Sequence, residues 1–148
     1  MKTVKKSVLP LQGFLMGLML SAALASYAHA ADTELENAIS RGQHSFSHDT
    51  FGGNGKVCES CHLAGGKQPG KLPDGKTIPS LANAATIFPR FQQRTGKVIT
   101  LTDQIRSCAT NALQGTPPDY GSAELNSLAS YITSIAQGKP VNMGGSPQ

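Results

Sequence analysis

The sequence contains no tryptophan, and only three tyrosines and five phenylalanines occur among its 148 residues. Glycine and proline are common instead, with 16 and nine residues. No internal repeat is present, so the chain does not predict a repeat architecture. Because few bulky apolar side chains are present, a core built from this chain alone would be thin.

Cysteine is also scarce, with three residues in the chain. Two of them form a C-x-x-C pair, but no second such pair and no H-x3-H follows to complete the four ligands of a structural zinc site. A thioredoxin-like dithiol would follow a strand in a βαβ pattern, and that pattern is missing too. The paired cysteines therefore call for another explanation.

The first thirty residues have the three parts of a secretory signal peptide. These parts are a basic start at Lys2, Lys5 and Lys6, an apolar run over 11–24, and the small-x-small pattern Ala28-His29-Ala30. We predict a signal peptide over residues 1–30, cleaved before Ala31, and a single domain over 31–148. An uncleaved membrane anchor is the alternative, although the run is short for a membrane span.

Once the predicted signal is removed, positive and negative charges are nearly balanced. The full chain has 13 Lys and Arg against nine Asp and Glu, but three lysines belong to the signal. The mature chain therefore carries 10 basic and nine acidic side chains, a net charge of +1. This balance does not favour nucleic-acid binding.

The C-x-x-C pair is part of a longer motif, Cys58-Glu59-Ser60-Cys61-His62. Two thiols one turn apart can both add to the vinyl groups of one porphyrin, and the adjacent imidazole can ligate its iron. We predict one haem c, with Cys58 and Cys61 as covalent attachment points and His62 as the proximal axial ligand. Covalent attachment of this kind resembles bacterial practice outside the inner membrane, so we expect a periplasmic protein. The porphyrin would also fill the thin core.

Apolar periodicity predicts an all-α, cytochrome c-like (class I) domain wrapped round this haem. The glycine- and proline-rich segment 64–79 predicts an irregular loop, and a strand pattern is limited to 98–100. We expect a first helix over 32–42, ended by Gly42, and a short helical turn over 81–88. A further helix should start at a capping box formed by Thr100 and Asp103 and end near Gly115. The last expected helix covers 122–137.

The third cysteine, Cys108, falls on an apolar helix face and stays unpaired once the motif is attached to porphyrin. It could be a buried thiol, or its thiolate could ligate the iron as the distal ligand. Met143, the sole methionine after the signal, is an alternative because small cytochromes c commonly use His/Met ligation. His44 and His48 are further candidates for the distal ligand; the alternative is that both are solvent-exposed loop histidines.

Several further motifs occur in a suggestive order. They are Phe51-Gly52-Gly53-Asn54-Gly55, Cys61-His62-Leu63-Ala64-Gly65-Gly66, Phe88-Pro89-Arg90-Phe91, Gly96, Ile99-Thr100-Leu101, Ile105, Cys108, Pro118 and the helix ending at Gly138. Together they resemble the haem domains of the thiosulfate-oxidising cytochromes, namely the SoxA subunit and the dihaem thiosulfate dehydrogenases. The resemblance covers most of the mature chain, and it implies that Cys108 is a distal haem ligand.

Two departures from these families bear on function. They usually carry an arginine four residues before the distal cysteine, where this chain has Gln104. The dihaem enzymes also need a second haem, whereas this chain has a single motif.

We therefore expect a periplasmic monohaem c-type cytochrome that transfers electrons between other periplasmic redox proteins, rather than an enzyme. No stable membrane span is expected after signal cleavage. The alternative is a haem enzyme or subunit acting on thiosulfate or a related sulfur anion. Arg90, Arg94 and Arg106 could attract such an anion, unless they are ordinary solvent-exposed surface residues. A haem sensor, with a labile or absent sixth ligand, is the third hypothesis.

Overall fold

The computed structural model describes the backbone of residues 14–148 and the side chains of residues 31–148. The chain divides into two units, Met1–Glu34 and Leu35–Gln148, and the second unit contains the candidate site. The predicted signal peptide thus has no described side chains, and its residues 1–13 lie outside the described residues. Within the described part of the chain, no helix combines the length and apolarity that crossing a membrane requires.

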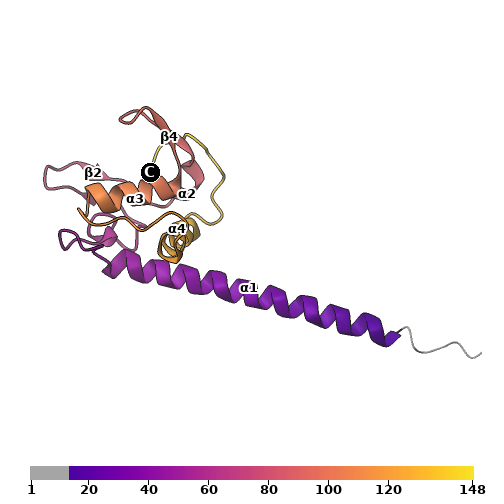
Figure 1. The fold of residues 1–148 in the computed structure, drawn as a ribbon. Coiled ribbons are helices and arrows are strands. Elements are labelled where there is room, and N and C mark those ends of the chain that lie inside the picture. Colours follow the sequence, from indigo (N-terminus) through magenta and orange to yellow (C-terminus); the bar gives the residue numbers. More distant parts are fainter. Residues whose placement is uncertain (1–13) are drawn as a thin grey trace, which may run out of the picture. The chain divides into compact units, whose positions relative to one another are not determined.

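The described chain contains helices and two small sheets (Figure 1). The α-helices are α1 (Phe14–His48), α2 (Ala84–Ile87), α3 (Leu101–Asn111) and α4 (Ala123–Ile135), and a 3-10 turn, η2, covers Cys58–Ser60. Antiparallel pairs are formed by β1 (Gly70–Lys71) with β2 (Thr77–Ile78), and by β3 (Arg90–Gln92) with β4 (Lys97–Ile99). The expectation of an all-α domain is therefore only partly right, and segment 64–79 is not wholly irregular.

The starts of α3 and α4 lie where the sequence predicted them. Thr100 caps α3: its hydroxyl accepts from the Asp103 N–H at 3.2 Å, and the Asp103 carboxylate accepts from the Thr100 N–H at 2.8 Å. The Ser122 hydroxyl caps α4 by accepting from the Leu125 N–H at 3.2 Å. Both capping groups satisfy helix N–H groups that would otherwise lack a partner.

The predicted end of the first helix at Gly42 is wrong, because α1 continues to His48. Gly42 is buried, and a Cβ there would lie 2.0 Å from the carbonyl oxygen of Ser127 in α4. One turn later, the rings of Phe46 and Tyr131 pack at 5.4 Å between centroids. The glycine therefore lets two backbones approach closely instead of ending a helix.

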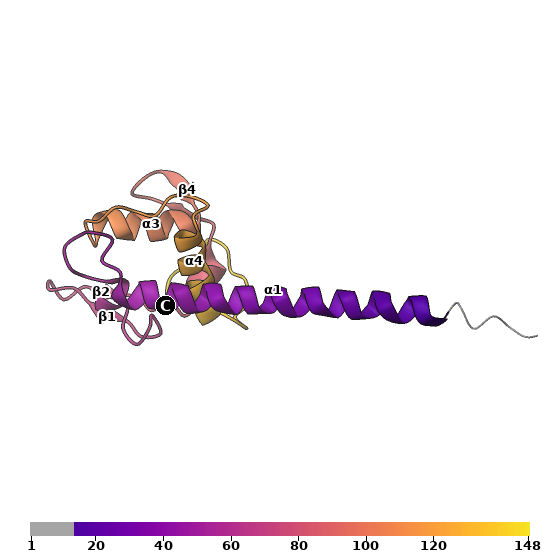
Figure 2. The same ribbon diagram turned by 60° about the horizontal axis from the view of Figure 1, so that its bottom comes forward.

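The core is formed mainly by the end of α1 together with α3 and α4. Its fully buried large side chains include Phe46, Leu125 and Leu128, and Ile105 and Leu113 join the same cluster. Both ribbon views place α3 beside α4 (Figures 1 and 2), in agreement with their contacts. This arrangement brings one face of α3 toward the C-x-x-C-H motif.

Candidate haem site

The C-x-x-C-H motif is held in a tight turn. The amides of Cys61 and His62 both donate to the Cys58 carbonyl, at 3.2 and 3.1 Å. Strand β1 packs directly on this turn, since a Cβ at Gly70 would lie 2.0 Å from the Cys61 carbonyl oxygen. The turn places both thiols and the imidazole in the wall of one cavity.

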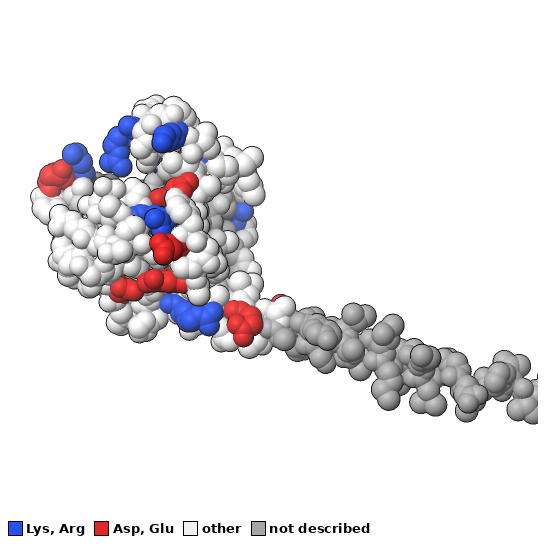
Figure 3. Space-filling model, in the orientation of Figure 1, with Lys and Arg blue, Asp and Glu red and all other residues white. Residues whose placement is uncertain are grey.

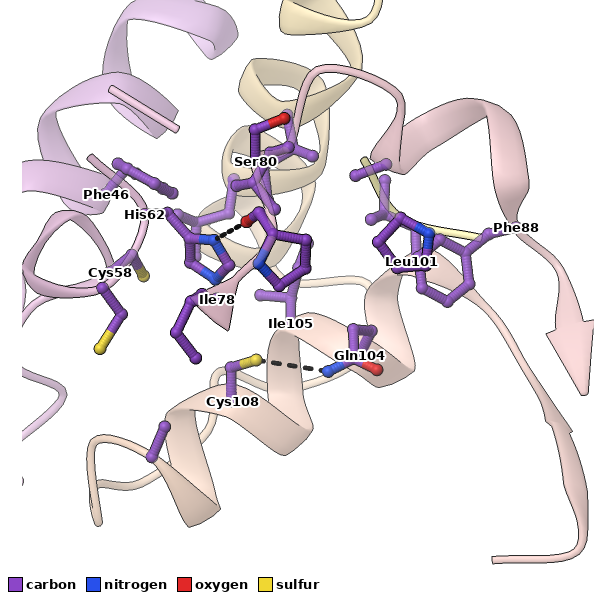
Figure 4. Close-up of a pocket in the computed structure, with 18 of the residues that line it drawn as sticks. Phe46, Cys58, His62, Ile78, Ser80, Phe88, Leu101, Gln104, Ile105 and Cys108 are labelled. Atoms are coloured by element: carbon purple, nitrogen blue, oxygen red, sulfur yellow. Dashed lines mark hydrogen bonds between the residues drawn. The ribbon is translucent and has the colours of Figure 1, made fainter. Parts of the chain in front are cut away.

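His62 is oriented by a backbone carbonyl. Its Nδ1 lies 3.0 Å from the Pro79 oxygen, as the dashed line in Figure 4 shows. A carbonyl can only accept, so Nδ1 carries the proton and Nε2 keeps a free lone pair. Burial lowers the pKa of His62, and the bond to Pro79 partly opposes that shift. The ring is therefore a neutral imidazole with a fixed tautomer, as a metal ligand requires.

The cavity between the motif and α3 has a volume of about 300 Å³. Its wall is largely apolar, and it is interrupted by three cysteines, one histidine, one serine, one glutamine and one arginine. The apolar side chains include Phe46, Ile78, Leu81, Ile87, Phe88, Leu101, Ile105, Leu128 and Ile132. Many of these belong to the hydrophobic core or pack against it. A group bound here would complete the core.

Cys108 projects into the same cavity from α3 (Figure 4). Its Sγ accepts a hydrogen bond from Gln104 Nε2 at 3.4 Å. Burial raises the pKa of Cys108, and the Gln104 bond opposes this rise. Burial, followed by the charge of Cys108, raises the pKa of Cys58 to about 12. All three thiols are free of disulfides. The structure therefore brings Cys58, Cys61, His62 and Cys108 to one site.

The other candidate distal ligands lie outside the cavity. The Met143 side chain is 66% exposed and is not part of the cavity wall, although the Gly144 N–H beside it donates to the Ile87 carbonyl. His44 and His48 are exposed in the last turns of α1, where their rings stack at 4.5 Å. Neither histidine lines the cavity.

The three arginines considered as anion ligands have different environments. Arg90 lines the cavity, and its Nε is buried without a hydrogen-bond partner. Arg94 is exposed, but its charge acts on Cys108. Arg106 donates to the Pro118 carbonyl and lies 4.2 Å from the centroid of the Tyr120 ring. Arg106 therefore anchors the segment after α3 and does not face the cavity.

Three features of the site were missed by sequence reasoning: the Pro79 carbonyl, the Gln104 bond to Cys108 and the inward position of Arg90. The Pro79 carbonyl has no side-chain signal at all. Gln104 stands one helical turn before Cys108, so their i, i+4 spacing could have indicated the contact. Arg90 was named together with Arg94 and Arg106, but nothing in the sequence set it apart, because a charged strand residue is ordinarily expected to face water.

These donors fit a covalently attached haem. Two adjacent thiols, a neutral imidazole with a free Nε2 and a largely apolar cavity have the chemistry that porphyrin attachment and iron ligation require. A buried arginine nitrogen without a partner adds a position for an acidic substituent. The fold and the site together define the chain as a cytochrome c domain.

Comparison with known proteins identifies the family of this cytochrome c domain. Residues 41–141 match the family described as SoxA/TsdA, cytochrome c domain, and the chain belongs to this family. Members of the family bind haem c, which confirms the predicted cofactor and the predicted resemblance.

Two relatives are thiosulfate dehydrogenases. The protein of Psychrobacter arcticus is 30% identical over 96 residues, which cover 65% of this chain and 27% of that protein. The protein of Allochromatium vinosum is 33% identical over 122 residues, covering 74% and 42%. This chain therefore spans less than half the length of either relative.

A solved structure shares the fold. The thiosulfate dehydrogenase TsdBA from Marichromatium purpuratum superposes with a TM-score of 0.58 at 24% identity, covering 74% of this chain and 24% of that one. At this identity the likeness concerns the fold alone.

Proposed function

We propose that this chain is a periplasmic monohaem cytochrome c that carries electrons between other redox proteins. In this proposal Cys58 and Cys61 hold the haem covalently, His62 is the proximal ligand and Cys108 the distal ligand. The supporting observation is the convergence of these four side chains on one largely apolar cavity. The bound haem would supply a reversible one-electron couple.

The chain's own residues orient the ligands and exclude water. The Pro79 carbonyl fixes the ring of His62 and makes Nε2 the free nitrogen. Gln104 donates to Cys108 and so limits the directions in which Sγ can point. The apolar wall lowers the local polarity around the site. Rigid ligands and a dry surrounding favour electron transfer, because little has to rearrange when the charge changes.

Two observations favour electron transfer over turnover. Gln104, a neutral side chain, occupies the position where the resembling families usually carry arginine, and it is already bonded to Cys108. Arg106, the nearest substitute in sequence, is bound to Pro118 and Tyr120. The site beside the distal thiol therefore has no cation on α3 that is free to bind an anionic substrate.

A second candidate function is oxidation or binding of a sulfur anion. The observation that favours it is the family itself, whose relatives include thiosulfate dehydrogenases, together with the charge of Arg94 acting on Cys108. In this candidate the anion would approach the Cys108 side of the haem.

Titration of the purified holoprotein tests the proposal. A carrier is expected to show covalent haem, a reversible one-electron reduction and no tetrathionate formation when thiosulfate and an electron acceptor are supplied. Rapid, saturable tetrathionate formation by the isolated protein would instead establish the second candidate. The periplasmic part is checked separately: the protein from a periplasmic fraction should begin at Ala31, and a haem protein retaining residues 1–30 would contradict the predicted cleavage.

A further inference from the structure

One side-chain nitrogen in the cavity wall is buried without a hydrogen-bond partner. Arg90 begins β3, and its Nε is a buried nitrogen with no hydrogen bond to any described residue. The ion pair found among the described side chains joins Lys76 to Asp74, so Arg90 has no carboxylate within reach in that part of the chain. Arg90 as a whole is half-buried, but a buried donor nitrogen left without an acceptor is unfavourable. Its position therefore suits an acidic group that the polypeptide does not supply.

The bound cofactor itself carries such groups. A haem bears two propionates, on the edge of the porphyrin opposite the vinyl groups that react with cysteine. Figure 4 shows Cys58 at one end of the cavity and Phe88 at the other. The guanidinium of Arg90 lies 5.6 Å from the centroid of the Phe88 ring, so Arg90 belongs to the end remote from Cys58. Attachment at the motif would direct the propionate edge toward this end.

We propose that Arg90 binds a haem propionate, with Nε as one of its donors. This inference rests on the covalent haem of the proposed function, and it assigns a further cofactor-binding residue. A guanidinium can donate two parallel hydrogen bonds to a carboxylate, and such charge-assisted pairs are among the strongest hydrogen bonds in proteins. The pair would satisfy the buried Nε and fix the porphyrin at the edge opposite its thioether bonds.

Neighbouring arginines provide a contrast and a control. Arg94 lies in the turn after β3 and is exposed, so it has no need of a buried partner. Arg106 is already bound to the Pro118 carbonyl. Arg94→Gln therefore removes the same charge from the same hairpin without removing a cavity-lining donor.

The test compares Arg90→Gln and Arg90→Lys with Arg94→Gln in the reduced holoprotein. Resonance Raman spectra report the hydrogen bonding of the propionates through their bending bands. Both Arg90 variants are expected to shift a propionate band, since even lysine lacks the Nε donor, and Arg94→Gln should leave it in place. Arg90→Gln should also lower the midpoint potential, because a nearby cation stabilises the ferrous form.

A measurement on the unaltered protein keeps the inference testable if the Arg90 variants do not fold. The Nε proton of Arg90 should give a resolved, slowly exchanging resonance in the diamagnetic ferrous state. Rapid exchange of this proton, or unshifted propionate bands in well-folded Arg90 variants, would overturn the inference while leaving covalent haem and the proposed carrier function intact. Thiosulfate-dependent spectral changes that need Arg90, with the propionate bands unmoved, would also overturn it.

Discussion

Cys108 is the residue whose chemistry decides the character of the proposed haem site. If its thiolate ligates the iron, Cys108→Ala should remove thiolate-type charge-transfer features and raise the midpoint potential, because a thiolate stabilises ferric iron. Cys108→Met should keep a six-coordinate spectrum while also raising the potential. Optical and electron paramagnetic resonance spectra of both variants measure these changes.

Met143→Ala is the matched control for the distal ligand. Because Met143 is exposed and outside the cavity wall, this variant should leave the spectrum nearly unchanged. Loss of a sulfur-to-iron band in Met143→Ala, together with an unaltered Cys108→Ala spectrum, would show His/Met ligation instead. Cys108 would then be a buried thiol bonded to Gln104.

Gln104 offers a second prediction at the residue scale. Gln104→Leu removes the donor to Cys108 Sγ, so the sulfur becomes a stronger electron donor to iron. We expect the potential to fall by about 40 mV, since a net hydrogen bond contributes roughly 1 kcal/mol. Gln93→Leu, at an exposed position of the hairpin, is the control. A potential that rises or stays constant in Gln104→Leu would contradict a bond from Gln104 to the distal ligand.

These residues also show what a sequence can reveal about a haem site. The prediction of an attachment motif depends on chemistry that is contained in five consecutive residues, Cys58 to His62. The partner of His62 was not predictable, since it is a backbone oxygen 17 residues away. Arg90 and Phe91 invert the usual pattern: the arginine nitrogen is buried while the phenylalanine is 61% exposed. The group proposed to pair with this arginine belongs to the cofactor, so no residue pattern encodes it.

At the scale of elements, the capping box of α3 can be tested directly. Thr100→Ala removes the N-cap hydroxyl, and the free energy of unfolding should fall by about 1 kcal/mol. The bonds from Tyr120 and Thr100 hold the pKa of Asp103 below its usual range. This stabilisation should be complete above the unfolded pKa of about 4 and should be lost as the pH falls through the lowered pKa.

Denaturant unfolding of the holoprotein at several pH values measures the capping effect. Thr110→Ala is the control, because Thr110 is exposed in the last turn of α3, away from the capping box, and alanine is a slightly better helix former. If Thr100→Ala were as stable as the unaltered protein at neutral pH, the capping box would not contribute to stability.

Gly42 supports a further prediction, about the contact between α1 and α4. A methyl group in Gly42→Ala would collide with the Ser127 carbonyl, so the two backbones must move apart. We expect a loss of about 1–3 kcal/mol, despite the better helix propensity of alanine. Thermal unfolding of the holoprotein checks this, with the exposed Ser40→Ala as control. Equal melting temperatures for both variants would contradict the close approach.

Local signals explain which elements were predictable. The starts of α3 and α4 were found because each has a capping side chain next to an apolar stripe. The end of α1 was misplaced, because the role of Gly42 depends on a residue of α4 that lies 85 positions later. Strands β1 and β2 were missed because each has only two residues, too few for an alternating pattern to be recognised.

Residues 31–148 carry nearly balanced charge, with 10 basic and nine acidic side chains, so in this part of the molecule the distribution of charge matters more than its sum. Residues 90–99, which form the β3–β4 hairpin, contain three cations and no acidic residue. Figure 3 shows blue without red at the top of the view, where this hairpin lies. Phe91 and Val98, which pair directly across the hairpin, are 61% and 69% exposed. An exposed apolar pair beside cations suits an acidic redox protein.

The proposed carrier function therefore predicts charge-dependent electron transfer through this hairpin. Oxidation of the ferrous protein by anionic ferricyanide should slow as ionic strength rises, and the Arg94→Gln, Lys97→Gln double variant should be roughly 3- to 10-fold slower at low salt. A cationic cobalt complex should show the opposite trend. Lys139→Gln, which removes a cation outside the hairpin, is the control. If Lys139→Gln slows oxidation as much as the double variant does, the net charge of the protein, and not the hairpin, determines the rate of encounter with ferricyanide. That result would refute a docking role for the β3–β4 hairpin.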